Sequence, residues 1–399
     1  MADSGNYFTG TKIMHTKLRD TSAEIADDLA CVAAILGDTN LLEHLLQKNV
    51  DFNKESDLFH RPLISAAKAG HEQACQFLLR HGANPNSVHQ DVIAQRQQYR
   101  SREALGLQLE HYDDALRAAC RGGHLSVVRL LFEPVNGLHF SPGYDDVLLV
   151  ATRASQAEIL EFLFNKADFP LLEEHLGPEI LRTAAKVGST AIVKMMLDGG
   201  VHVNMESEDR KRRLECAAWR GHEGTVRLLL DRGAKFDCLC IPHSAITDAA
   251  HGGHLSVVKT LLEYGADVNT EWPRCNTPLY QAAIENRIQM VNYLLRQGAD
   301  PFFQGCGYRA LDQVAFHGNE EMIRILHKAG LKINGPRTDG RRCSHPPVAR
   351  AMSNGKTSTV QLLLELGAEE VDPLTTAYRT GFLDGTYPRP KPPLPLLGP

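Results

Sequence analysis

The apolar and polar positions of residues 245–269 predict two short helices joined by a turn. Ala249 and Ala250 lie on one face of the first helix and are small enough to let another helix approach closely. Gly253 ends that helix, and apolar residues then recur at helical spacing at Val257, Val258, Leu261 and Leu262. About 25 residues are too few to bury both faces alone, so the unit needs neighbours of the same kind.

The same pattern recurs along the chain with a period near 33 residues. The sequence H-L-S-V-V-R at 124–129 nearly repeats H-L-S-V-V-K at 254–259, which lies 254 − 124 = 130 residues later. One anchor residue marks the turn of each unit, and the anchors are Gly37, Gly70, Gly123, Ser155, Gly188, Gly221, Gly253, Asn286, Gly318 and Gly355. Successive separations are 33, 53, 32, 33, 33, 32, 33, 32 and 37, which gives ten candidate units.

This period, together with A-A-x-x-G-H and L-L-x-x-G-A-D-x-N, resembles the ankyrin repeat family over roughly residues 22–372. The resemblance implies an all-α solenoid of stacked helix–turn–helix pairs with projecting finger loops. The family's T-P-L start survives fully only at residues 277–279, so the array is degenerate. The unit at 147–164 is the most eroded, because Ser155 stands where glycine belongs, and we expect faster hydrogen exchange there than in 214–334.

The pattern divides the chain into three parts. We expect a flexible arm over residues 1–21, the repeat array over 22–372, and a proline-rich tail over 373–399. The 53-residue step holds about 20 extra residues, which we place in an insertion at 87–112. The insertion is either an enlarged loop or helix projecting from one face, or a tolerated mobile loop.

Composition limits the compartment and the partners. A net charge of −5 argues against bulk nucleic-acid binding, and nine cysteines without framework spacing suit reduced thiols in the cytoplasm or nucleus. The polar N-terminal stretch lacks the apolar core of a secretory signal, and no run approaches about 18 apolar residues. We therefore expect protein partners, with no direct contact to nucleic acid or membrane.

The sequence contains little that indicates catalysis. There is no phosphate loop, no nucleophile elbow and no dinucleotide fingerprint. Four histidines share the position after the anchor, and we interpret them as partners of backbone groups: His71, His124, His222 and His254. Cys238, Cys240 and His243 share one turn, but C-x-C is a poor spacing for structural zinc. We expect no catalytic residue, cofactor or metal, and the function to be that of an adaptor or scaffold.

An enzyme is the alternative from another class. A cryptic site would lie in the eroded region 134–180. A deep cleft lined by Asp145, Asp146 and His175 would favour the enzyme, and a shallow continuous groove would favour the adaptor.

The resemblance also locates a partner site. In the family, the two residues between A-A and the anchor face a concave groove, and the candidates here are Lys68, Arg121, Arg153, Lys186, Trp219, Arg220, His251, Ile284 and Phe316. Trp and Arg often dominate interface energies. We predict an elongated partner segment with an apolar anchor near Trp219, Ile284 and Phe316 and acidic residues toward Arg121 and Lys186. Alternatively, Ile284 and Phe316 are core residues between helices.

Two further stretches suggest signals. The basic run Arg210, Lys211, Arg212 and Arg213 resembles a short nuclear-localisation sequence, which would fit a regulatory protein such as a transcription coregulator. A solvated turn paired with neighbouring acids is the alternative. In the tail, Arg389, Pro392 and Pro395 fit the pattern of an SH3 or WW ligand, whereas an inert tail is the other interpretation.

Overall fold

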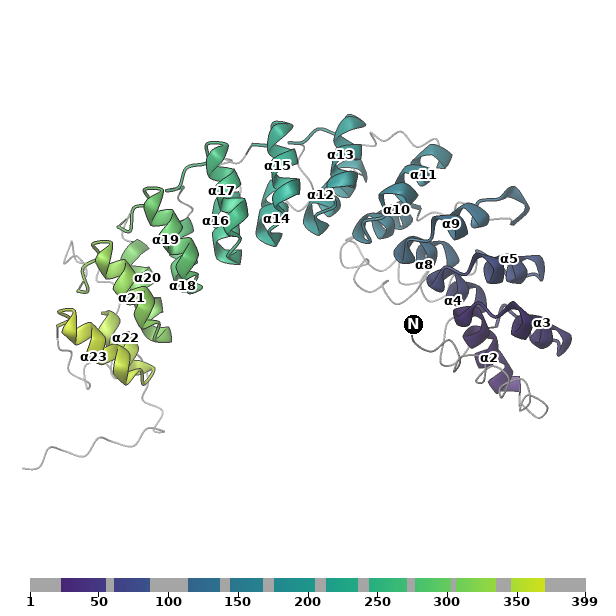
Figure 1. Cartoon of the computed structure of the whole chain (residues 1–399), viewed down its shortest axis with the longest axis horizontal. Coiled ribbons are helices and arrows are strands. Elements are labelled where there is room, and N and C mark those ends of the chain that lie inside the picture. The colour runs from purple at the N-terminus through teal and green to yellow at the C-terminus, as the bar shows by residue number, and fades with distance from the viewer. Residues whose placement is uncertain are drawn as a thin grey trace, which may run out of the picture. The chain divides into compact units, whose positions relative to one another are not determined.

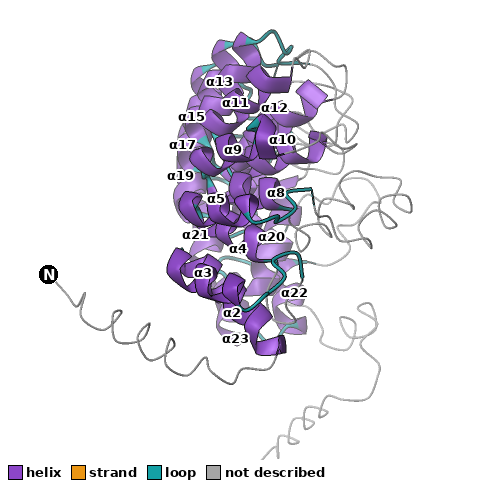
Figure 2. Ribbon diagram, turned by 90° about the vertical axis from the view of Figure 1, so that its right-hand side faces the viewer, coloured by secondary structure: helices purple, strands orange, loops and turns teal. Residues whose placement is uncertain are grey.

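The computed structural model describes residues 23–54, 61–86, 114–136, 144–167, 176–204, 213–235, 244–270, 277–302, 306–334 and 346–369. Within these ranges the chain forms twenty α-helices, one short 3-10 helix and no strand (Figures 1 and 2). The predicted all-α fold is therefore confirmed. The predicted arm, insertion and tail, including Arg389, Pro392 and Pro395, lie outside the described residues.

The described residues fall into two compact units. The first unit comprises Met1–Arg213 and Asp231–Gly233, and the second comprises Leu214–Leu230 and Ala234–Pro399. The helices of the first unit are α2 (Ala23–Leu36), α3 (Thr39–Gln47), α4 (Pro62–Ala69), α5 (Glu72–Arg80), α8 (Ala115–Gly122), α9 (Leu125–Leu131), η3 (Pro134–Asn136), α10 (Tyr144–Arg153), α11 (Ala157–Ala167), α12 (Leu176–Val187) and α13 (Thr190–Asp198). The following helices are α14 (Arg213–Arg220), α15 (Glu223–Asp231), α16 (Ala245–Gly252), α17 (Leu255–Glu263), α18 (Pro278–Ile284), α19 (Ile288–Arg296), α20 (Cys306–His317), α21 (Glu320–Lys328), α22 (Pro347–Ser353) and α23 (Thr357–Glu365).

Each unit is a stack of helix pairs. The first helices of successive pairs pack side by side, in the order α2, α4, α8, α10, α12 in the first unit and α16, α18, α20, α22 in the second (Figure 1). The second helix of a pair packs on the first. The alanine pairs, such as Ala66-Ala67 and Ala249-Ala250, are fully buried in this packing. The core is therefore built from alanine faces of first helices and from leucines and valines of second helices, as the periodicity predicts.

The turn inside each pair explains the anchor glycine. Gly70 has φ of 80°, a left-handed conformation that favours glycine. A Cβ on Gly70 would also lie 2.3 Å from Nδ1 of His124, which belongs to the next repeat. The Nε2–H of His124 donates to the carbonyl oxygen of Lys68 at 3.0 Å. The same link joins His71 to Ile35 at 2.9 Å and His254 to Trp219 at 3.0 Å.

These histidine links confirm for His71, His124 and His254 that the imidazole bonds to a backbone group, with one refinement. The acceptor lies in the preceding repeat and not in the histidine's own loop, so the side chain holds two neighbouring repeats together. The glycine therefore meets two demands at once, the left-handed backbone and room for an incoming imidazole ring.

Two anchors without glycine keep the turn. Ser155 has φ of 58° and Asn286 has φ of 55°, so both adopt the left-handed conformation that glycine adopts elsewhere. Asparagine is among the residues that tolerate this conformation, whereas serine is less suited to it. The erosion at Ser155 therefore changes the side chain and leaves the turn in place.

Arg213 departs from the exposed basic run suggested by the sequence. Its side chain is only 2% exposed, and its Nη2 donates to the carbonyl oxygen of Pro178 on α12 at 3.4 Å. A basic residue that packs at the start of a helix is not displayed to a transport receptor. Residues 210–212 lie outside the described part of the chain.

Candidate partner-binding surface

The row position is the place two residues before each anchor, near the C-terminal end of a first helix. The residues at the row position are Ile35, Lys68, Arg121, Arg153 and Lys186 in the first unit and Trp219, His251, Ile284, Phe316 and Ser353 in the second. The backbone at this position is held alike in several repeats, because the carbonyl oxygens of Ile35, Lys68 and Trp219 accept from histidines of the next repeat. None of these ten side chains is buried.

The first unit displays cations at its row position. Lys68, Arg153 and Lys186 are exposed and Arg121 is half-buried. They come from four consecutive first helices, α4, α8, α10 and α12, which pack side by side. Within the described ranges, neither Lys68 nor Arg153 makes an ion pair. The fold therefore lines up four positive charges, one per repeat.

An exposed apolar pair precedes these cations. Ile35 is 39% exposed and Leu36 is 52% exposed, although both follow the buried alanines of α2. The set of candidates predicted from the sequence began with the second repeat and missed them. The signal was present, because A-A-I-L-G at 33–37 fits the A-A-x-x-G pattern used for the later repeats.

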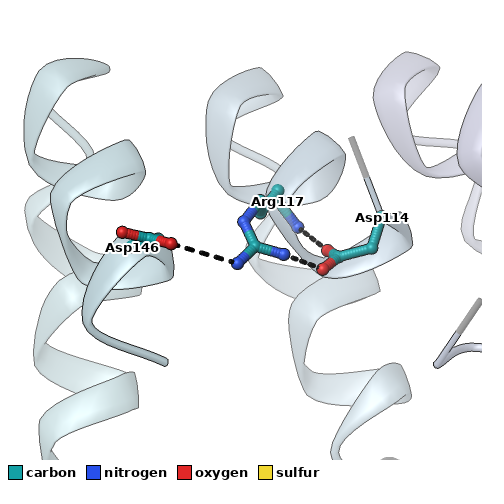
Figure 3. A network of polar contacts seen from close by, with 3 residues as sticks. All are labelled: Asp114, Arg117 and Asp146. Carbon is teal, nitrogen blue, oxygen red and sulfur yellow. Dashed lines mark hydrogen bonds and ion pairs between the residues drawn. The ribbon is translucent and has the colours of Figure 1, made fainter. Parts of the chain in front are cut away.

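Charges one turn earlier on the same helices serve the fold. Arg117 on α8 lies between Asp114 and Asp146, and pairs with both carboxylates (Figure 3). The distance from its Nη2 to Oδ2 of Asp146 on α10 is 3.7 Å. Asp114 also caps α8 by accepting from the backbone N–H of Arg117 at 2.7 Å. On α12, Arg182 pairs in the same way with Glu179 at 2.6 Å.

The second unit displays an aromatic pair at its row position. Trp219 is 45% exposed and stacks on His251, with ring centroids 4.8 Å apart and planes 19° from parallel. His251 Nδ1 donates to Oε1 of Gln281 at 3.0 Å and lies 3.7 Å from Oε1 of Glu285. The polar contacts orient the imidazole, and the imidazole in turn supports one face of the indole. Arg220, next to Trp219, is exposed.

Ile284 and Phe316 fall between the two alternatives that the sequence left open. Both are half-buried, so neither is a core residue and neither is as exposed as Trp219. The guanidinium carbon of Arg350 lies 5.4 Å from the centroid of the Phe316 ring, and His317 makes an edge-to-face contact with that ring, with centroids 5.3 Å apart. Of the three residues predicted to form the apolar anchor, Trp219 is therefore the most exposed.

The described residues offer little for catalysis. Among them, no group of three or more histidine, cysteine or acidic side chains is placed to hold a metal ion. Burial raises the pKa of the Cys75 thiol to about 12 and also raises the pKa of the Cys120 thiol, so both stay protonated and unreactive at neutral pH. Asp146 is engaged with Arg117, and His175 lies outside the described residues. No described helix is long and apolar enough to cross a membrane.

The helix pairs are stacked and joined by histidine links, and their exposed side chains vary at one repeated position. These features define a helical-repeat protein whose surface can differ between repeats. A family model of three ankyrin repeats matches residues 29–136 and 148–240, and a second model of many ankyrin repeats matches 246–295 and 279–327. The chain belongs to the ankyrin repeat family, as the sequence pattern indicates. Its array is accordingly a protein–protein interaction domain.

Known relatives support the family and leave the partner open. An ankyrin repeat domain-containing protein SAT10 of Stachybotrys chartarum is 27% identical over 332 residues, which is 82% of this chain and 16% of that protein. The B-cell lymphoma 3 protein homolog of Mus musculus is 26% identical over 40% of this chain and 37% of that protein. The chain thus spans well under half the length of these relatives. The solved ankyrin repeat domain of human ASB11 is 26% identical, with a TM-score of 0.49 over 58% of this chain and all of that domain.

Proposed function

We propose that the chain is a non-catalytic adaptor that binds a segment of a partner protein along the row position, with Trp219 as the main anchor. The observation that carries this proposal is the exposed indole stacked on His251. A large exposed aromatic ring beside an exposed arginine, Arg220, is the composition typical of an interface hot spot.

The support under Trp219 strengthens the case for an anchor. An aromatic side chain that is already held in place loses little conformational freedom when a partner packs on it. His251 supplies that support from the next repeat, and Gln281 holds His251 by a hydrogen bond of 3.0 Å. The Trp219 side chain therefore presents a preorganised apolar surface.

Affinity capture from the native cell tests the proposal, with the full-length chain as bait and Trp219→Ala as the variant. We expect the variant to lose its main partner, since truncating a hot spot costs about 2 kcal/mol or more, or roughly 30-fold in Kd. Thermal unfolding should remain close to that of the wild type.

Phe302→Ala is the matched control. Phe302 is 41% exposed, close to the value for Trp219, but lies outside the row position. We expect it to keep the partner. Equal loss of binding by both variants, or unfolding of Trp219→Ala, would show that Trp219 is no specific anchor.

The nuclear role is a separate proposal and rests on residues 210–212 alone, because Arg213 is buried. A fluorescent fusion with residues 210–212 changed to alanine and Arg213 retained should shift to the cytoplasm. An unchanged distribution would end this proposal without affecting the adaptor.

The tail is proposed as an SH3 or WW ligand on the sequence pattern of Arg389, Pro392 and Pro395. A peptide of residues 386–399 should bind members of an SH3 and WW panel at micromolar concentrations and lose binding on Arg389→Ala. Absence of binding across the panel would retire the idea.

A further inference from the structure

The first unit carries a second surface that is independent of Trp219. Five consecutive first helices present an apolar pair, Ile35 and Leu36, and then one cation each at the row position: Lys68, Arg121, Arg153 and Lys186. These helices pack side by side in the order α2, α4, α8, α10, α12. The surface therefore has an apolar end and a row of positive charges that repeats once per helix.

The spacing of this row selects the conformation of a ligand. Neighbouring packed helices lie about 8–10 Å apart, so successive cations repeat at about that distance. In a β-strand, successive side chains point to opposite faces, so residues three positions apart do not share a face. A polyproline II helix has three residues per turn and rises about 3.1 Å per residue, so side chains at every third position share one face about 9 Å apart. This period matches the row of helices.

We propose that the first unit binds an extended acidic segment in the polyproline II conformation. An acidic side chain at every third position faces Lys68, Arg121, Arg153 and Lys186 in turn, and an apolar residue at the end of the segment covers Ile35 and Leu36. The inference rests on the proposed protein-binding function, but it uses a different unit from the Trp219 anchor.

Charge complementarity specifies the acidic partner. The chain as a whole has a net charge of −5, yet all four row positions from α4 to α12 are basic. Arg117 and Arg182, on the same helices, are already paired with carboxylates inside the fold. At the row position, Lys68, Arg153 and Lys186 are exposed and Arg121 is half-buried. An array of charges of one sign attracts and orients a ligand of the opposite sign.

The same row is poorly suited to single-stranded nucleic acid. Such surfaces combine a basic track with aromatic side chains on which bases stack. Among the described row residues of the first unit there is no aromatic side chain, and the apolar pair at its end is aliphatic. An acidic peptide uses both the cations and the aliphatic end.

Fluorescence anisotropy of the full-length chain with labelled peptides tests the proposal. The probe peptide has leucine followed by four repeats of Pro-Pro-Glu, and the comparison peptide has the same composition with its four glutamates adjacent. We expect the periodic peptide to bind at least about tenfold more tightly and to weaken as salt is raised. Equal affinities, or no binding of the periodic peptide at micromolar concentrations, would overturn the proposal.

Variants locate the site. Lys68→Glu and Arg153→Glu should each weaken the periodic peptide by about tenfold, whereas Lys194→Glu should change its affinity less than about twofold. Lys194 is an exposed cation of the same unit on α13, outside the row position. Equal weakening by Lys194→Glu would reduce the effect to net charge and contradict the alignment of the peptide with the row.

The apolar end has its own test. Leu36→Ser should weaken the peptide that begins with leucine and leave a peptide that begins with serine unaffected. Equal effects of Leu36→Ser on both peptides would remove the apolar contact from the proposal.

Two further measurements distinguish the proposed peptide site from the Trp219 anchor and from a nucleic-acid surface. Trp219→Ala should leave binding of the periodic peptide unchanged, so failure of the Trp219 anchor and failure of the cation row are distinguishable. Loss of peptide binding in Trp219→Ala would place the peptide on the second unit and overturn the inference. Displacement of the peptide by polyuridine at lower concentration than by unlabelled peptide would identify a nucleic-acid surface instead.

Discussion

The two units use the same paired helices and the same turn, yet they display different chemistry at the row position. The first unit presents Lys68, Arg153 and Lys186 to solvent, and the second presents Trp219. Both units share the alanine pairs and the histidine links that hold neighbouring repeats together. Because none of the row side chains is buried, this position can differ between repeats without disturbing the core.

The units also differ one turn earlier on the first helices, where side chains do serve the fold. In the first unit, Arg117 is 8% exposed and paired with two carboxylates. In the second, the equivalent places hold Thr247, which is buried, and Asp312, which is half-buried. Glu215, at the equivalent place on α14, is also buried, so the clearest contrast is between the paired Arg117 and the uncharged Thr247, which the following changes can test.

The largest effect is expected from Arg117→Met. Removing the guanidinium leaves the carboxylates of Asp114 and Asp146 without this partner in a poorly solvated place, and breaking such a pair from one side costs about 3 kcal/mol of unfolding free energy. Urea unfolding combined with hydrogen exchange should assign the loss to the first unit.

Thr247→Val is the control at the equivalent position of the second unit. Among the described residues the Thr247 hydroxyl is buried without a hydrogen-bond partner, so its replacement by a methyl group should be neutral or slightly stabilising. A cost similar to that of Arg117→Met would remove the contrast between the units.

Asp312→Asn should sharpen the comparison through pH. Burial raises the pKa of Asp312 to about 7, while Arg350 and Arg309 oppose this shift. Since the pKa in the folded state lies above the unfolded value of 3.8, the protonated form is favoured by folding. The contribution of protonated Asp312 to the free energy of unfolding is therefore complete below about pH 4 and is lost as the pH rises to about 7.

Asp312→Asn removes this loss, so its advantage over the wild type should grow by about 2 kcal/mol between pH 5 and pH 7. Chemical unfolding at the two pH values measures it. A difference between Asn and Asp that stays constant with pH would show that Asp312 ionises normally in the folded chain.

The smallest effect concerns the two anchors that lack glycine. Ser155→Gly should stabilise the first unit by about 1 kcal/mol, because glycine adopts φ of 58° without the steric cost that a side chain carries. Asn286→Gly should gain less, since asparagine tolerates this conformation better. Hydrogen exchange over residues 147–164, expected to be faster than over 214–334, should slow in Ser155→Gly. A larger gain at Asn286 than at Ser155 would contradict this ranking.

The sequence predicts the fold well because its signals are local and repeated. Alanine pairs, anchors and leucines recur at one period, so even Ser155 and Asn286 were aligned with the glycine anchors, and the structure shows that both adopt the left-handed conformation of those glycines. Ile35 and Leu36 were within reach of the same pattern. The stack of Trp219 on His251 was not, because it depends on how closely two helices from different repeats approach.

Arg213 shows what a charge pattern in the sequence does not predict. A run of four basic residues suggests an exposed turn, but the helix begins inside the run and carries its last member toward Pro178. The boundary between loop and helix, which a charge pattern does not specify, decides whether a cation is displayed or buried.

The histidine links also determine when the turns can close during synthesis of the chain. The turns at Gly37 and Gly70 are each closed by a histidine of the following repeat, which lies 36 residues after Ile35 and 56 residues after Lys68. At about 5–20 residues per second on the ribosome, the turn at Gly70 stays open for several seconds after its own helices have emerged. Until the following repeat has been synthesised, such a turn therefore lacks the histidine hydrogen bond that closes it. At Gly355, by contrast, a Cβ would meet no described atom within 4 Å, so no side chain among the described residues closes this turn.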